Sequence, residues 1–225
     1  AGVAQMQITL GLPRLIEILD ARKRPSTPLM EIYPDTSHNN EKDARILAEK
    51  IKEVKLKEIM SSINIDFGGK KIEAEIDSKS LKDVHIGIQK VFDKLKDRKF
   101  KVNLSGNKII IHVDEMDFKD IYKTKEKLKE MVISGVKGIS QVVVSKKGRD
   151  FMIYATGSNL REVIEIKGVN RDKISSNDLH DINAVFGIEA TRRAIINEIK
   201  NVLQNQGLDI DERHLSLVAD AMTYS

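Results

Sequence analysis

Residues 63–76 read INIDFGGKKIEAEI, and this stretch decides the fold class. Apolar residues alternate with polar ones on both sides of Gly68-Gly69, at positions 63, 65 and 67 before the pair and 72, 74 and 76 after it. Alternation with a period of two places one face of a strand on a core, and Gly-Gly between two such strands favours a tight turn. The stretch therefore predicts an antiparallel β-hairpin with one buried face.

The same hairpin pattern occurs twice more along the chain. A second pair of alternating runs brackets Ser105-Gly106-Asn107, and a third brackets Lys146-Lys147-Gly148. Each hairpin is followed by apolar residues at spacings of three and four, which is typical of a helix packed along one side. After the first hairpin we expect one helix through residues 81–95, capped by Ser80 with Asp83 reaching back. The chain is thus predicted to repeat a unit of hairpin followed by helix.

The two ends of the chain differ from this central body. All four prolines lie within residues 1–34, where Pro13 fits the first turn of a helix that ends before Pro25. We expect Arg22, Lys23 and Arg24 at the C-terminus of that helix. After residue 167 the pattern is helical, with Asn177 as one helix cap. We predict an α+β fold with a Pro-rich strap over 1–34, a hairpin-helix body over 35–167 and a helical part over 168–225.

The composition excludes several classes of protein. The 225 residues contain no cysteine, which excludes a disulfide scaffold, a thiolate nucleophile and cysteine-type metal sites. The 38 Lys and Arg nearly balance the 34 Asp and Glu, so the net charge of +4 permits contact with a polyanion without demanding it. No apolar run approaches the ~20 residues that span a bilayer, and no signal-peptide pattern is present. These features favour a soluble intracellular protein.

Motifs of a self-contained active site are absent from the sequence. The chain lacks the P-loop, dinucleotide-binding, nucleophile-elbow and HExxH zinc motifs. The five histidines are scattered, and a zinc site needs three or four converging ligands. Lysine-rich runs such as 50–58 and 123–130 interleave both signs of charge, which is typical of a solvated helix face. We therefore predict no catalytic residue and no metal site in this chain.

Two pairs of basic residues in the C-terminal helices, Arg192-Arg193 and Arg213-His214, are candidates for phosphate contact. The helix dipole disfavours a cation at a helix N-terminus, which is where Arg213 is expected. A phosphate held by the guanidinium and the helix N–H groups would explain an arginine there. The alternative is an ion pair with a neighbouring carboxylate, from Asp209, Asp211 or Glu212.

Two groups of short blocks carry a resemblance to a known family. The first group is Ala1-Gly2-Val3-Ala4, residues 9–15 (TLGLPRL) followed one position later by Glu17-Ile18, and Pro25-Ser26-Thr27-Pro28. The second group is Gly157-Ser158-Asn159-Leu160, residues 186–192 (FGIEATR), Arg213-His214-Leu215 and Met222-Thr223. In this order and spacing they resemble the largest subunit of archaeal and eukaryotic RNA polymerases, from just after the trigger loop onward. In archaea this region lies on a separate polypeptide, the C-terminal A″ part.

The resemblance implies a place within a larger enzyme that copies DNA into RNA by two-metal nucleotidyl transfer. The magnesium ions are bound by the larger A′ part, so no cofactor is expected in this chain. Ala1 and Gly2 would belong to the return hinge of the trigger loop, with Gly11, Pro13 and Arg14 supporting it. The middle would form jaw and cleft, and the last helix would begin the switch region. Expected partners are the A′ part, the small jaw subunit (termed H), other polymerase subunits and downstream duplex DNA.

The expected function is a structural and DNA-guiding part of a cytoplasmic transcription enzyme, inactive by itself. Both ends of the sequence look cut, which suggests a piece of a longer polypeptide. Because the apolar residues of the strap are expected to pack on absent polymerase parts, we expect residues 41–167 to fold without residues 1–34. The alternative is an independent, non-catalytic module that binds nucleic acid or protein and shares only the hairpin-helix units.

Overall fold

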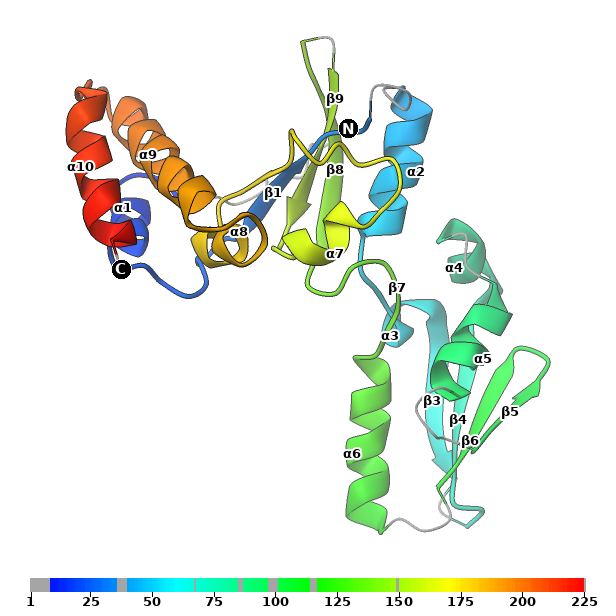
Figure 1. The fold of residues 1–225 in the computed structure, drawn as a ribbon. Helices are drawn as coiled ribbons and strands as arrows, with labels where there is room; N and C mark the ends of the chain where they lie inside the picture. The colour runs from blue at the N-terminus through cyan, green and yellow to red at the C-terminus, as the bar shows by residue number, and fades with distance from the viewer. Residues whose placement is uncertain are drawn as a thin grey trace. The chain divides into compact units, whose positions relative to one another are not determined.

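The computed structural model describes residues 9–35, 40–66, 68–84, 87–96, 101–113, 117–148 and 150–224. Its helices and antiparallel sheets confirm the α+β class (Figure 1). The chain divides into unit 1, residues 1–52 with 138–225, and unit 2, residues 53–137. Unit 2 is therefore an insertion in the sequence of unit 1, and this division differs from the predicted segments 1–34, 35–167 and 168–225.

Unit 2 contains two of the predicted hairpins in one sheet. Its elements are β2 (Val54–Lys55), α3 (Leu56–Ile59), β3 (Met60–Asp66), β4 (Lys71–Ile76), α4 (Ser78–Asp83), α5 (Ile88–Lys96), β5 (Lys101–Ser105), β6 (Lys108–His112), α6 (Phe118–Lys129) and β7 (Val132–Ser134). The four long strands pair antiparallel in the order β3-β4-β6-β5. Ile72 and Ile111 lie opposite each other in β4 and β6, and both are fully buried. The alternation in the sequence therefore marks the core face correctly.

The helix expected through residues 81–95 is two helices, α4 and α5. Gly87, a poor helix former, lies between them. The predicted capping by Ser80 is wrong as well. Asp77 accepts hydrogen bonds from the Lys79 amide at 3.0 Å and the Ser80 hydroxyl at 2.8 Å, and these bonds lower the pKa of Asp77. Asp77 serves as the cap because it directly precedes the first helical residue.

The short strands β2 and β7 pair where the chain enters and leaves unit 2. Val54 lies opposite Ser134 in this ladder. Beside it, Glu130 accepts from Nζ of Lys55 at 2.7 Å and from Nζ of Lys57 at 2.6 Å. These hydrogen bonds lower the pKa of Glu130 to about 2. The ends of the insertion are thus held together inside unit 2 itself.

Unit 1 combines a sheet with a helical layer. Its elements are α1 (Leu12–Leu19), β1 (Leu29–Ile32), α2 (Glu41–Ile51), β8 (Gln141–Lys147), β9 (Asp150–Thr156), α7 (Leu160–Ile164), β10 (Ser175–Ser176), α8 (Leu179–Phe186), α9 (Ile188–Asn205) and α10 (Glu212–Thr223). The sheet has the order β10-β1-β9-β8, and α2 packs along β8 and β9. The third predicted hairpin, β8–β9, is therefore part of this sheet.

Strand β1 lies inside the sheet of unit 1, between β10 and β9. Leu29 pairs with Thr156 on one side, and Glu31 pairs with Ser175 on the other. Met30 and Ile32 are fully buried. The expectation that the apolar residues of the strap pack on absent parts is therefore wrong for β1, because these two side chains complete the core of this chain.

The helical layer of unit 1 is built on α9, which packs against α1 and α10. Ile18 of α1, Ile199 of α9 and Leu215 of α10 are buried in one cluster. Helix α1 ends at Leu19, so the expectation that residues 22–24 lie at its C-terminus is wrong. Among the described residues, no helix is long and apolar enough to cross a membrane.

Candidate functional site

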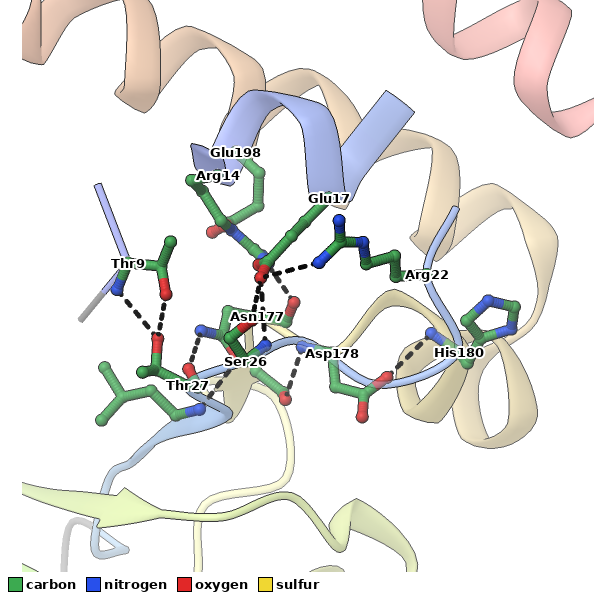
Figure 2. A network of polar contacts seen from close by, with 12 residues as sticks. Thr9, Arg14, Glu17, Arg22, Ser26, Thr27, Asn177, Asp178, His180 and Glu198 are labelled. Carbon is green, nitrogen blue, oxygen red and sulfur yellow. Dashed lines mark hydrogen bonds and ion pairs between the residues drawn. The ribbon is translucent and has the colours of Figure 1, made fainter. Parts of the chain in front are cut away.

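A buried ionic network centred on Arg14 joins three segments of unit 1 (Figure 2). Arg14 lies on α1 and is 6% exposed. Its Nε and Nη2 atoms donate to Oε2 of Glu198 on α9, at 3.2 and 2.8 Å. Its Nη1 donates to Oε2 of Glu17 at 3.2 Å, and Nη2 also donates to the carbonyl of Asn177 at 2.7 Å. A buried guanidinium is stable only when it is paired and hydrogen-bonded, as it is here.

Glu17 is the second buried charge of the network and is 4% exposed. Its Oε1 accepts from the amide of Ser26 at 3.2 Å and from the Ser26 hydroxyl. Burial alone raises the pKa of Glu17, but the bonds from Ser26 and Arg14 outweigh it and lower the pKa below its ordinary value. The guanidinium of Arg22 lies 3.8 Å away. Glu17 is therefore held as a carboxylate that connects α1 to the turn before β1.

Asn177 extends the network to the start of β1. Its side-chain oxygen accepts from the amide of Leu29 at 2.8 Å, and its side-chain nitrogen donates to the carbonyl of Thr27 at 2.9 Å (Figure 2). The predicted cap of α8 is therefore wrong, because this side chain is engaged elsewhere. Asp178 caps α8 instead, accepting from the amides of His180 and Asp181 at 3.1 and 3.2 Å.

The network fixes positions and offers no reactive group. The carboxylates of Glu17 and Glu198 are paired with Arg14, and the structure describes no buried polar side-chain atom without a partner. No three His, Asp or Glu side chains converge into a metal-binding group within the described ranges. The arrangement can lock α1 against α9 and against the chain that enters the sheet.

The predicted trigger-loop support residues fall partly within this network. Ala1 and Gly2 lie outside the described residues. Gly11 precedes α1 with a φ of +67°, and a Cβ there would lie 3.2 Å from Nε2 of Gln206, so this position suits glycine. Pro13 lies in the first turn of α1, as expected. Arg14 holds that helix in place, and the support role of these residues stays a prediction.

Arg213 and His214 lie in the first turn of α10, and both are exposed. Arg213 uses Nη2 and Nε to contact both carboxylate oxygens of Asp211, at 2.7 to 3.2 Å. Hydrogen bonds from the Arg213 side chain and amide lower the pKa of Asp211 to about 2. The ion pair considered as the alternative is therefore formed, and a phosphate would have to compete with Asp211.

Arg192 and Arg193 lie on α9, away from Arg213. The guanidinium of Arg192 donates to Asp220 of α10, whereas Lys200 further along α9 pairs with Glu212 at 3.1 Å. The two helices therefore run antiparallel, and Arg213 lies level with Lys200, eight residues or about 12 Å from Arg192. The structure does not bring the two predicted basic pairs into one patch.

Arg193 lines a groove of about 370 Å³ next to the network. Ile182, Ala190 and Ala194 contribute apolar lining, and Glu198 lies in its wall. Both signs of charge thus border the groove, so its electrostatics favour no single class of ligand. Whether Arg193 contacts DNA stays a prediction.

Sequence reasoning missed Glu17, Asn177 and Glu198 as members of the network, and Asp178 as the cap of α8. One signal was available for the first of these: Arg14 and Glu17 are spaced i, i+3 in the otherwise apolar segment LPRLIEIL. Glu198 and Asn177 are 184 and 163 positions from Arg14. No local pattern relates residues at such separations.

Comparison with known proteins finds the RNA polymerase largest-subunit family over the whole chain. Residues 1–225 match the family model described as RNA polymerase Rpb1, domain 5. The DNA-directed RNA polymerase subunit Rpo1C of Methanocaldococcus jannaschii is 42% identical over 225 residues, which cover 99% of this chain and 26% of that relative. The chain thus spans about a quarter of the length of this curated relative. The resemblance seen in the sequence blocks is confirmed: the chain belongs to the family of RNA polymerase Rpb1, domain 5.

Proposed function

We propose that this chain is a structural, downstream-DNA-guiding part of the largest subunit of a DNA-directed RNA polymerase. The observation that carries the proposal is the extent of the similarity, because the family match and the 42% identity cover the chain from end to end. The buried network supports the proposal, because a scaffold that carries moving parts needs fixed geometry. Within the enzyme, Arg14 and its partners would hold α1 as a rigid support.

In this proposal the chemistry of RNA synthesis lies elsewhere in the enzyme. The larger A′ part would bind the magnesium ions and the growing RNA end, and this chain would supply neither acid nor base. Among the described residues, three buried side chains can carry charge: Arg14 and Glu17 are paired with one another, and Asp178 caps α8. Their expected contribution is to hold position throughout the reaction cycle.

The proposed partners are the A′ part, the small jaw subunit, other polymerase subunits and downstream duplex DNA, in the cytoplasm. Unit 2 has 19 Lys and Arg against 15 Asp and Glu, whereas unit 1 has 19 of each, so the net charge of +4 belongs to unit 2. DNA contact through so small a charge should be weak, sequence-independent and sensitive to salt. By counterion release we expect roughly two to four phosphate contacts, each contributing ~0.9 to the log–log salt slope.

Co-purification tests the proposal directly. The tagged chain is co-expressed with the A′ part and the small jaw subunit, and an unrelated bait with the same tag serves as control. We expect both partners to be retained with the chain in equal amounts and washed from the control. Retention of neither would contradict the proposal and favour an independent binding module.

A further inference from the structure

Helix α1 buries two charged side chains, Arg14 and Glu17, whereas three of its large apolar side chains are exposed. Arg14 and Glu17 are 6% and 4% exposed. Leu12, Ile16 and Leu19, spaced i, i+4 and i+7 along one stripe, are 67%, 42% and 48% exposed. A helix on the free surface of a domain normally presents polar residues to water. The stripe therefore has the composition of a covered face.

The rotation of α1 about its axis is fixed by the ionic network. Turning the helix to bury the stripe would pull Arg14 from Glu198, and Glu17 from Ser26, and leave buried charges unpaired. Ile18 is 1% exposed on the inner side and would leave the core as well. The specific contacts of Arg14, Glu17 and Ile18 thus keep the apolar stripe facing outward, and its exposure does not result from loose packing of the helix.

Other exposed apolar residues adjoin the stripe. Leu10, just before the helix, is 60% exposed. The neighbouring Gly11 approaches Gln206 at the end of α9, and the chain after Gln206 carries Leu208 and Ile210, which are 53% and 40% exposed. The apolar surface therefore continues from α1 toward the loop that connects α9 to α10.

We propose that the stripe of Leu12, Ile16 and Leu19 is an interface covered by another segment of the same largest subunit. This inference rests on the proposed function. The covering segment would be apolar along the stripe and acidic near Lys23 and Arg24. These two exposed cations follow the helix and form no ion pair with any described residue, whereas Arg22 faces Glu17.

Two observations select this occupant. The matched residues are 26% of the length of the relative Rpo1C, so most of such a subunit lies outside them. A few aliphatic side chains offer an area on the order of a few hundred Å². A stable contact between separate proteins buries roughly 1,200–2,000 Å² in total. The stripe is too small to hold a free partner or a second copy alone, but it suits a segment held nearby by further contacts of the same subunit.

Site-specific photo-crosslinking in the assembled polymerase tests the assignment. A photoreactive amino acid replaces Leu12 or Ile16, and crosslinked peptides are identified by mass spectrometry. A third variant places it at Ile46 on α2, which is 51% exposed but has charged neighbours on its helix face at Lys42, Glu49 and Lys50. We expect positions 12 and 16 to crosslink to largest-subunit peptides outside residues 1–225, at least tenfold above the Ile46 control.

Each other outcome overturns the assignment. Crosslinks to a second copy of the chain, to a subunit other than the A′ and A″ parts of the largest one, or at the Ile46 level would show another occupant or an open surface. If the unmodified chain does not enter the polymerase at all, the proposed function itself is contradicted, so this result is distinguishable from a failure of the interface assignment alone.

As a second measurement, Ile16→Glu should lower incorporation at least tenfold in competition with wild type, with the circular dichroism of the isolated chain unchanged. Ile46→Glu should stay within twofold, and equal incorporation of both variants would also overturn the assignment.

Discussion

Arg14 and Glu198 are 184 residues apart in the sequence, yet two nitrogen atoms of the guanidinium donate to one carboxylate oxygen at 3.2 and 2.8 Å. The Arg14 side chain is 7% exposed and that of Glu198 is 25% exposed. This pair connects the first described helix of the chain to the longest helix near its end. This geometry makes Arg14 a structural determinant of unit 1.

Replacing Arg14 with alanine should destabilise unit 1 strongly. The substitution removes the buried cation beside Glu17, leaving only the half-exposed Arg22 at 3.8 Å, and it removes the Arg14 donor from the carbonyl of Asn177. Removal of one partner of a buried ion pair typically costs about 3–5 kcal/mol. Chemical denaturation of the isolated chain, followed by circular dichroism, measures the loss. Arg14→Lys should restore little of the lost stability, because one ammonium group cannot reproduce the contacts of the guanidinium.

Arg45→Ala is the matched control, since Arg45 also lies on a helix and pairs with a glutamate. It donates to Glu41 at 2.6 Å, but both side chains are more than half exposed. Exposed pairs of this kind add little to stability. A loss for Arg14→Ala that is no greater than the loss for Arg45→Ala would contradict the structural role of the network.

The stability of unit 1 should depend on pH through Glu17. Its pKa is lowered from 4.5 in the folded state, so the unfolded chain binds this proton more readily. The stabilisation is therefore fully present above about pH 4.5 and is lost as the pH falls through the lower folded pKa. Denaturation at a series of pH values between 7 and 3 should show the wild type approaching Glu17→Gln at the acidic end. A difference in the free energy of unfolding between wild type and Glu17→Gln that stays constant over this pH range would argue against an ionised Glu17.

Residues 53–137 should fold when expressed alone. Unit 2 has its own core, which includes Ile72, Leu95 and Ile111, and its ends meet in the β2–β7 ladder. We expect a cooperative thermal transition for this fragment, with a lower midpoint for Glu130→Gln, which weakens the contacts to Lys55 and Lys57. A fragment without a cooperative transition would show that unit 2 depends on residues outside 53–137.

Gly157→Ala should destabilise unit 1 more than Gly148→Ala does. Both glycines have positive φ angles, +121° and +66°, so both substitutions strain the backbone. A Cβ at Gly157 would lie 2.0 Å from the carbonyl oxygen of Gly138, whereas a Cβ at Gly148 meets nothing within 4 Å. Overpacking costs about 1–3 kcal/mol or more where backbone cannot move. Equal unfolding midpoints for the two variants would contradict the close approach at Gly157.

Arg213→Ala separates the two roles considered for this arginine. If Arg213 holds phosphate in the assembled enzyme, the substitution should shorten the lifetime of the elongation complex at moderate salt, with assembly and thermal stability nearly unchanged. If the contact with Asp211 is its only role, neither assay should change, since exposed ion pairs contribute little. A wild-type lifetime across a salt titration would remove Arg213 from the DNA-contact candidates.

The sequence predicted the hairpins well because alternating apolar residues and turn glycines lie within a few positions of one another. Alternation around Gly68-Gly69 fixes both the strands and their buried face, and tertiary contacts do not override it. The error at Asn177 has a different cause. Asn and Asp are both good caps, and the choice of Asp178 follows from bonds that Asn177 makes to Thr27 and Leu29, about 150 residues away in the sequence.

The spacing of apolar residues along α1 could not indicate that its charged face is buried and its apolar stripe exposed, again because distant residues decide this. Helical spacing groups Leu12, Ile16 and Leu19 into an apolar stripe, which would normally be assigned to the core. The stripe faces outward because Arg14 finds Glu198, a partner that local sequence does not indicate. Sequence reasoning therefore missed the features of the site that depend on buried ionic contacts between segments far apart in the chain.

The most direct test of the account is template-directed RNA synthesis with and without this segment. Polymerase is assembled from its remaining parts, and this chain is then added or omitted, with magnesium and nucleoside triphosphates present in every reaction. We predict no RNA from the purified chain alone, little from the assembly that lacks it, and recovery of synthesis and of downstream-DNA retention when it is added. RNA synthesis by the chain alone, or full activity and DNA retention without it, would contradict its assignment as a structural part of the enzyme.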